Sequence, residues 1–177
     1  MDRAEAGGLR VLGVDPGLRV TGWAILGAQG ERLRLLDCGT IATDARSPLA
    51  QRLLCIYDGL AEVLMRWHPW EVAVEEPFVA GNRRSAMVLG EARAAALLAA
   101  AAEGLPVHQY PPTEVKQLVT GYGRSDKSQV QAMLCIQLGL AEPPASADAA
   151  DALAVALCHL LRRRGDMLVE SREERPT

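Results

Sequence analysis

Three apolar segments joined by short turns open the sequence, and their order limits the possible folds more than any other feature of the chain. The turns are Pro16-Gly17 and Ala28-Gln29-Gly30. Segments joined by turns this short pair as antiparallel neighbours in one sheet. Two further apolar segments follow, each after a long segment with helical spacing. The five expected strands span residues 9–15, 19–27, 32–43, 71–76 and 106–110.

The remaining segments have the periodicity of helices. Ser47 is the expected N-cap of the first, with Pro48 at its first helical position, and Ser125 is the expected cap of the fourth. The order of elements predicts an α/β fold: a five-stranded mixed sheet, antiparallel over the first three strands and then continued by parallel βα units, with flanking helices. This is the ribonuclease H-like arrangement. The five expected helices span residues 47–67, 83–103, 112–120, 126–139 and 148–164.

Length and composition indicate one globular domain. The chain has 177 residues, of which 49% are hydrophobic and 23% charged, and this suits a single hydrophobic core. We expect one domain over residues 1–177, with loose tails over 1–8 and 165–177. No apolar run is long enough to span a bilayer and the first residues lack the order of a signal peptide, so we expect a cytoplasmic protein without membrane contact.

The cysteines and the net charge say less about partners. No two cysteines form a CxxC pair, so we expect reduced thiols and no structural zinc. A net charge of −3 argues weakly against a nucleic-acid partner, unless several of the acids bind metal ions. The cysteines are Cys38, Cys55, Cys135 and Cys158.

Two carboxylates stand at strand ends and two at the start of a helix. Asp15 and Glu75 end the first and fourth strands, and each follows a small residue on the same face of its strand. Asp148 and Asp151 open the last helix at a spacing of three, so they share one helix face. Taken singly, such acids are more often solvated strand ends or helix caps. Their combination among apolar neighbours favours a metal site.

The chemistry of these four acids favours hard divalent cations. Carboxylates that lie close together repel one another unless cations offset their charge. Oxygen ligands suit Mg²⁺ or Mn²⁺ and not zinc. Two such ions about 4 Å apart can hold a phosphodiester, activate a water molecule and stabilise the leaving oxygen.

Five motifs, in order, resemble the RuvC family of Holliday-junction resolvases, and together they cover most of the chain. They are GVDPGLRVTGWAI, VAVEEPF, NRRSAMVLGEARAA, VKQLVTGYGRSDKSQVQAML and ADAADALAVALCH. The resemblance implies a homodimeric, divalent-metal endodeoxyribonuclease that resolves four-way DNA junctions in homologous recombination and repair. It further implies symmetric cuts that leave 5′-phosphate and 3′-hydroxyl ends, and a branch-migration partner of the RuvA/RuvB type.

The resemblance also assigns the acids. Asp15, Glu75, Asp148 and Asp151 match the four catalytic acids, which bind two Mg²⁺ or Mn²⁺ ions per active site. Asp15 would be the central bridging carboxylate, sharing one ion with a helix acid, and Glu75 would help to hold the second ion. The separate duties of the two helix acids are left open, as is a supporting role for Glu76.

Seven residues are the expected DNA contacts: Phe78, Asn82, Arg83, Arg84, Lys116, Arg124 and Lys127. Composition alone makes Phe78 a core residue, whereas the resemblance implies a ring that stacks on a base near the junction centre. The free N–H groups at the start of the second helix favour phosphate contacts there. Lys127 opens a helix, where the dipole disfavours a cation, so we expect it to serve a ligand.

The helix over 83–103 carries small residues on several faces. Packing on the sheet explains them, and the resemblance adds a homodimer interface, since a two-fold dimer suits a two-fold junction. We interpret His159 as a residue of the helix face and Arg162–Arg164 as compensation for the helix dipole.

Three other functions remain as alternatives. A ribonuclease H-like enzyme could act on RNA or on simple DNA ends, and cleavage of linear substrates would distinguish it. GVDPG is similar to the first phosphate loop of actin-like ATPases, which would require ATP binding and a second half-domain. A junction-binding module with an inactive site would bind DNA without cutting it.

Overall fold

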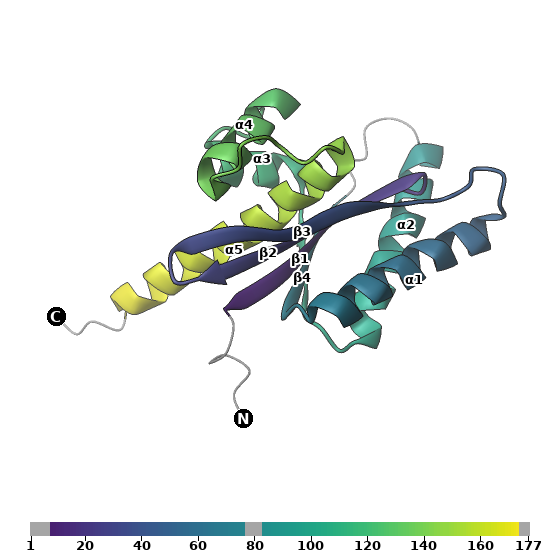
Figure 1. Cartoon of the computed structure of the whole chain (residues 1–177), viewed down its shortest axis with the longest axis horizontal. Coiled ribbons are helices and arrows are strands. Elements are labelled where there is room, and N and C mark those ends of the chain that lie inside the picture. The colour runs from purple at the N-terminus through teal and green to yellow at the C-terminus, as the bar shows by residue number, and fades with distance from the viewer. Residues whose placement is uncertain (1–7, 77–82, 174–177) are drawn as a thin grey trace.

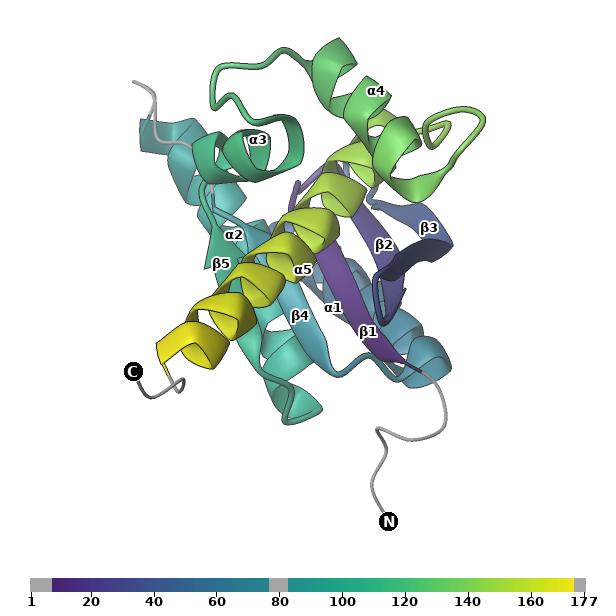
Figure 2. The same cartoon turned by 90° about the vertical axis from the view of Figure 1, so that its left-hand side faces the viewer.

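The computed structural model describes residues 8–76 and 83–173, with side chains described over 8–76 and 90–166. Its centre is a five-stranded sheet in the order β3-β2-β1-β4-β5 (Figure 1, and Figure 2 for β5). The first three strands pair antiparallel, whereas β4 and β5 run parallel to β1. The predicted mixed sheet is confirmed. The strands are β1 (Leu9–Asp15), β2 (Val20–Gln29), β3 (Arg32–Ala42), β4 (Glu71–Glu75) and β5 (Val107–Tyr110).

Helices cover both faces of the sheet within the described residues. α5 lies across one face with α3 and α4 packed outside it, and α1 and α2 cover the other face (Figure 2). Two hydrophobic clusters result, one on each side of the sheet. The helices are α1 (Leu49–Trp67), α2 (Arg83–Ala102), α3 (Pro112–Thr120), α4 (Lys127–Leu138) and α5 (Ala147–Glu173).

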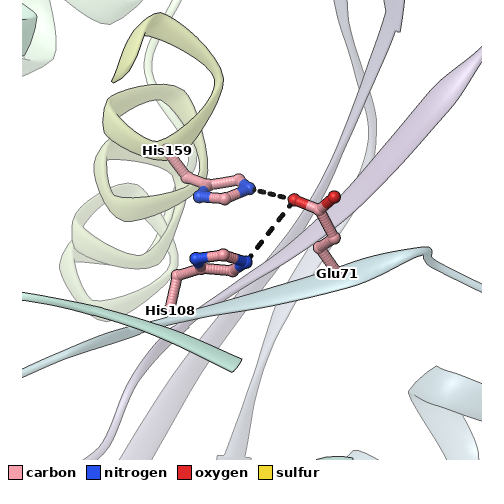
Figure 3. Close-up of side chains that lie close together, drawn as sticks. All are labelled: Glu71, His108 and His159. Carbon is pink, nitrogen blue, oxygen red and sulfur yellow. Dashed lines mark hydrogen bonds and ion pairs between the residues drawn. The ribbon is translucent and has the colours of Figure 1, made fainter. Parts of the chain in front are cut away.

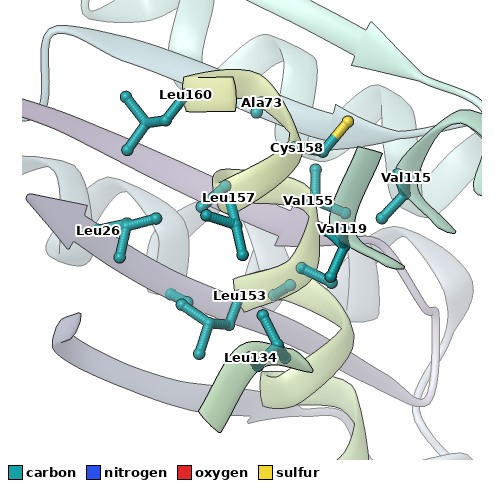
Figure 4. Packing of buried hydrophobic residues seen from close by; sticks show 14 of the residues in the cluster. Leu26, Ala73, Val115, Val119, Leu134, Leu153, Val155, Leu157, Cys158 and Leu160 are labelled. Atoms are coloured by element: carbon teal, nitrogen blue, oxygen red, sulfur yellow. The ribbon is translucent and has the colours of Figure 1, made fainter. Parts of the chain in front are cut away.

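α5 approaches the sheet closely because two glycines lie beneath it. The buried side chains of its first half fill the space between the sheet, α3 and α4 (Figure 4). A Cβ atom on Gly13 would lie 2.2 Å from the carbonyl oxygen of Ala152, and one on Gly22 would lie 2.0 Å from that of Asp148. Gly22 is also the β2 partner of Asp15. The small residues beside Asp15 therefore make room for a helix.

The predicted serine caps are both wrong. α1 begins at Leu49, one residue later than predicted, with Pro48 at the N-cap and no side-chain cap bond to take the role expected of Ser47. Ser125 is buried and bonds within the preceding loop instead. The cap of α4 is Asp126, whose carboxylate accepts a backbone N–H one turn into the helix, as a good N-cap does.

α5 continues to Glu173, past the predicted end at Arg164. The expected loose tail is therefore wrong for residues 165–173. The predicted end rests on Gly165, but a glycine inside a helix lowers the stability of the helix without ending it. One described contact crosses the predicted end of the helix, an i,i+4 ion pair of 3.8 Å between Arg162 and Asp166.

The arginines at this end of α5 do more than compensate the helix dipole. Each binds a different part of the fold, which ties this single turn of the helix to three of its neighbours. Arg162 pairs with Glu114 of α3, Arg163 pairs with Glu71 of β4, and Arg164 donates to the carbonyl oxygen of Gly30 at 2.9 Å.

Thiols and hydropathy add two facts about the described chain. The four cysteines are free, and Cys158, on the inner face of α5, is buried. Over residues 8–76 and 83–173, no helix combines the length and the hydrophobicity needed to cross a membrane.

Candidate active site

Asp15 and Glu75 leave the sheet side by side. β1 and β4 are parallel neighbours with Val14 opposite Val74, so the next residue of each strand emerges at the same level. Alternation along the strands turns both carboxyls to the face covered by α5. The first turns of α5 cross that face and bring Asp151 to the same place.

These carboxyls line a pocket of about 360 Å³ at the end of the sheet. Three acids and both lysines of the chain lie in this one hollow, and apolar side chains of α3, α4 and α5 form its walls. The lining residues are Asp15, Glu75, Pro112, Val115, Lys116, Lys127, Val130, Asp151 and Ala154.

The two strand carboxyls hold protons more tightly than ordinary acids. Burial raises the pKa of Asp15 to about 6, and the charge of Asp151 adds to this shift. Burial also raises the pKa of Glu75 to about 8, with the charge of Asp15 as the second cause. The two carboxyls hydrogen-bond to each other, so they share a proton near neutral pH, as close carboxylates do when no cation lies between them.

Lys127 neutralises part of the remaining charge. Its Nζ lies 2.6 Å from Oδ2 of Asp151, and this hydrogen bond is the main cause that raises the pKa of Lys127. A capping box between Asp126 and Gln129 fixes the start of α4 and so the position of this lysine. The ammonium at an unfavourable helix end is thus paired with an acid of the pocket.

Asp148 is not among the residues that line the pocket. It is half-buried in the first turn of α5, and its Oδ2 accepts a hydrogen bond from Oγ of Ser146 at 3.5 Å. Its charge still reaches the pocket, because after burial and the charge of Asp151 it contributes to the raised pKa of Asp15. The two helix acids therefore differ in position, with Asp151 the closer to the strand carboxyls.

The donor atoms of the pocket fit hard divalent cations. Asp15, Glu75 and Asp151 offer only carboxylate oxygens, which are the ligands that Mg²⁺ and Mn²⁺ prefer. In the absence of metal ions, the shared proton and the Lys127 ammonium offset part of the negative charge of these acids. Among the described residues, these acids do not form a group of three with ligand atoms within 4.8 Å of one another, so bound ions would draw the carboxylates together.

The other expected DNA contacts lie away from the pocket or outside the described residues. Arg124 is exposed in the loop between α3 and α4. Arg83 and Arg84 begin α2, but their side chains lie outside the described set, and Phe78 and Asn82 lie outside it altogether.

Sequence reasoning did not identify the walls of the pocket. Val115 and Val130 belong to the buried faces of α3 and α4, and their helical spacing was the available signal. The structure also separates the adjacent acids of β4: Glu75 lines the pocket, whereas the backbone N–H of Glu76 donates to the carbonyl oxygen of Tyr110 at 2.8 Å.

Comparison with known proteins gives one consistent family. Residues 11–159 match the family described as crossover junction endodeoxyribonuclease RuvC. A relative of that name from Chloroflexus aggregans is 48% identical over 151 residues, which cover 85% of this chain and 92% of that protein. Another, from Rhodopseudomonas palustris, is 50% identical over 155 residues, or 88% of each chain.

Solved structures agree with the sequence match. RuvC of Thermus thermophilus, in complex with a Holliday junction substrate, superimposes with a TM-score of 0.84 at 36% identity and covers 89% of this chain and 96% of that one. A yeast mitochondrial Holliday junction resolvase, at 11% identity and a TM-score of 0.62 over 93% of this chain and 85% of that one, shares the fold. The predicted ribonuclease H-like fold is confirmed.

Proposed function

Because this chain belongs to the RuvC family of crossover junction endodeoxyribonucleases, we propose that it resolves four-way DNA junctions by hydrolysing one phosphodiester bond in each of two strands. The structural likeness to a relative bound to a Holliday junction supports this substrate. The activity would serve homologous recombination and repair in the cytoplasm.

The observation that carries this proposal is the convergence of three acids and two lysines in one pocket. Asp15, Glu75 and Asp151 come from two strands and a helix that are far apart in sequence. Lys116 and Lys127 enter from α3 and α4 on the open side, where a phosphate would approach. Oxygen ligands beside ammonium groups suit a phosphodiester better than an uncharged substrate.

We infer that the four acids would hold two Mg²⁺ or Mn²⁺ ions per active site. When bound, such ions activate a water molecule and stabilise the charge that develops on the phosphate and the leaving oxygen. The acids would orient a water molecule for attack in line with the bond between phosphorus and the 3′ oxygen. Breaking that bond leaves a 5′-phosphate and a 3′-hydroxyl. Lys127, released from Asp151, would bind a phosphate oxygen.

A homodimer is proposed through the outer face of α2. Gly90, Ala94 and Leu98 follow one another at a spacing of four and lie away from the sheet. Leu98 is 63% exposed, which is unusual for a large apolar side chain unless another surface covers it. A second copy of α2 could pack there closely, and the two active sites of a two-fold dimer would give paired cuts.

The remaining contacts with DNA and protein follow from the resemblance. Arg124, Arg83 and Arg84 are proposed to bind phosphates, Asn82 to lie beside them, and Phe78 to stack on a base near the crossover. A RuvA/RuvB-type branch-migration complex is the proposed protein partner.

The test is cleavage of a synthetic mobile four-way junction with Mg²⁺ and separately with Mn²⁺. Wild type should give symmetric paired nicks near the crossover. Asp15→Asn should lower the rate by on the order of 10²–10³-fold or more, because it removes the central ligand and a charge at the reaction site. Junction affinity measured without divalent ions should change little. Asp44→Asn, an exposed acid outside the pocket, is the matched control and should cleave normally.

Other outcomes would replace the proposal. Faster cleavage of a linear duplex or of an RNA–DNA hybrid would favour the ribonuclease H-like alternative. Tight junction binding with no nicks in either metal would make the chain a binding module, and the acids would need another explanation.

A further inference from the structure

A second cluster of ligand-type side chains lies at the other end of β4. Glu71 begins that strand, His108 lies on β5 and His159 lies on α5. Their nearest ligand atoms all lie within 4.8 Å of one another. Both imidazole rings turn their Nε2 atoms toward the same carboxylate oxygen of Glu71 (Figure 3).

The topology of the sheet builds this cluster independently of the acid pocket. His108 is the β5 partner of Ala73, and Glu71 lies two residues before Ala73, so both side chains point to the α5 face. His159 comes eight residues after Asp151, which places it about 12 Å farther along the helix. The cluster and the acid pocket therefore have no residue in common.

His159 is held as metal-binding histidines usually are. It is buried, and its Nδ1 lies 2.7 Å from the hydroxyl of Tyr110. A partner on one ring nitrogen fixes the ring and directs the other nitrogen to a ligand. Burial, followed by the charge of His108, lowers the pKa of His159 to about 4, so the ring is neutral at pH 7 and can offer a lone pair.

His108 distinguishes this cluster from an ordinary buried hydrogen bond. His159 and Glu71 satisfy each other directly, with Nε2 of His159 2.6 Å from Oε2 of Glu71. His108 adds a second Nε2 aimed at the same oxygen, but at 3.7 Å, which is too long for a hydrogen bond. Its side chain is 44% exposed, so the third ligand also opens the site to solvent.

We propose that Glu71, His108 and His159 form a binding site for one divalent transition-metal ion of the zinc class, with water as the fourth ligand. Two imidazoles, one carboxylate and an open position form a known zinc ligand set. Nitrogen ligands select Zn²⁺, Co²⁺, Ni²⁺ or Cu²⁺ over Mg²⁺, whereas the oxygen ligands of the acid pocket favour Mg²⁺ and Mn²⁺. The lack of a CxxC pair does not bear on a site made from histidines.

Arg163 is the charged neighbour that acts against a cation here. Its guanidinium pairs with Oε1 of Glu71 and leaves Oε2 to the imidazoles. The ion would displace the proton between His159 and Glu71 and would draw His108 inward. Because the three ligands come from β4, β5 and α5, the bound ion would clamp the helix to the sheet.

The test is a titration of metal-free protein with Co²⁺, whose visible absorption is strong in tetrahedral and weak in octahedral coordination. Wild type should bind one Co²⁺ per chain with the strong band, and Zn²⁺ should abolish that band by competition. His108→Phe keeps a planar ring at an exposed position and should weaken Co²⁺ binding more than about tenfold. Asp15→Asn should leave the band unchanged, which separates this site from the proposed nuclease.

The third histidine of the chain supplies the matched control. His68 ends α1 in the left-handed region, which asparagine also adopts readily, so His68→Asn should retain the band. A band that survives His108→Phe, or that never forms in folded wild type at millimolar Co²⁺, would show that the cluster is only a hydrogen-bond network.

Discussion

At the scale of single residues, the carboxyls of the pocket oppose folding when no cation is present. Glu75 has a pKa raised to about 8, chiefly by burial, whereas an unfolded glutamate ionises near its ordinary value of 4.5. Above that value the unfolded chain has released a proton that the folded chain still holds. The contribution of Glu75 to stability therefore falls as the pH rises from about 4.5 to about 8.

We predict that Glu75→Gln stabilises the metal-free protein at pH 8 and has little effect at pH 4.5. The gain should be on the order of 1–3 kcal/mol, because the substitution removes an ionisation that burial and Asp15 oppose. The measurement is denaturant unfolding of both proteins in EDTA across this range. Burial lowers the pKa of His159, so its contribution to stability rises with pH in both proteins. The difference in stability between the two proteins removes this contribution. An equal effect at both pH values would contradict the prediction.

The role of a residue can be predicted where it depends on the position of that residue along a strand or helix. It is harder to predict where it depends on neighbours that are distant in sequence. Asp15 and Glu75 were identified because strand ends are visible in the hydrophobic pattern. His159 was not, since an isolated histidine on a helix gives no sign that Glu71 and His108 will lie beside it. The pairing of Lys127 with Asp151 was equally hidden, because the two residues belong to different helices.

At the scale of elements, the site depends on how closely α5 lies on β1 and β2. Gly13 and Gly22 allow this approach, because backbone atoms of α5 occupy the space that side chains at these two positions would need. We predict that Gly13→Ala destabilises the protein by at least about 2 kcal/mol, since the added methyl group meets helix backbone that cannot move aside locally. The same displacement moves Asp151 from Asp15, so cleavage should fall more than the folded fraction does.

Gly165 in the same helix is the matched control. Nothing lies within 4 Å of the Cβ position there, so Gly165→Ala should raise stability by roughly 0.5–1 kcal/mol through helix propensity alone. Thermal unfolding and single-turnover cleavage of both variants measure the two effects. Equal stability of Gly13→Ala and wild type would show that the helix can shift at no cost.

The boundaries of elements were less predictable than their order. Every strand and helix appears where the pattern placed it, because hydrophobic periodicity extends over many residues. The ends depend on single contacts. Gly165 ended the predicted helix, but α5 continues past it to Glu173, with an ion pair between Arg162 and Asp166 across that position. Asp126 caps α4 in place of Ser125, because its carboxylate accepts from the helix backbone while Ser125 is buried.

At the scale of the whole molecule, the paired incision that we propose would require two chains in one complex. We predict that Leu98→Glu shifts the protein from dimer to monomer in sedimentation experiments, because it places charge on the apolar outer face of α2. With the two sites no longer joined, single nicks should replace paired ones. Ile136→Glu changes an even more exposed apolar residue on α4, on the other side of the sheet, and should leave the dimer intact. A Leu98→Glu protein that stays dimeric would place the interface elsewhere.

The pairing of Lys127 with Asp151 also bears on the metal-free state of the protein. Lys127 pairs with Asp151, and Asp15 and Glu75 share a proton. These two positive charges offset most of the negative charge of the pocket before any metal ion binds. We therefore expect the chain to fold in the absence of metal, and in that state to bind DNA without cleaving it. Metal ions would then replace the Lys127 ammonium and the shared proton as the positive charges of the pocket, and the chain would not need to refold to become active.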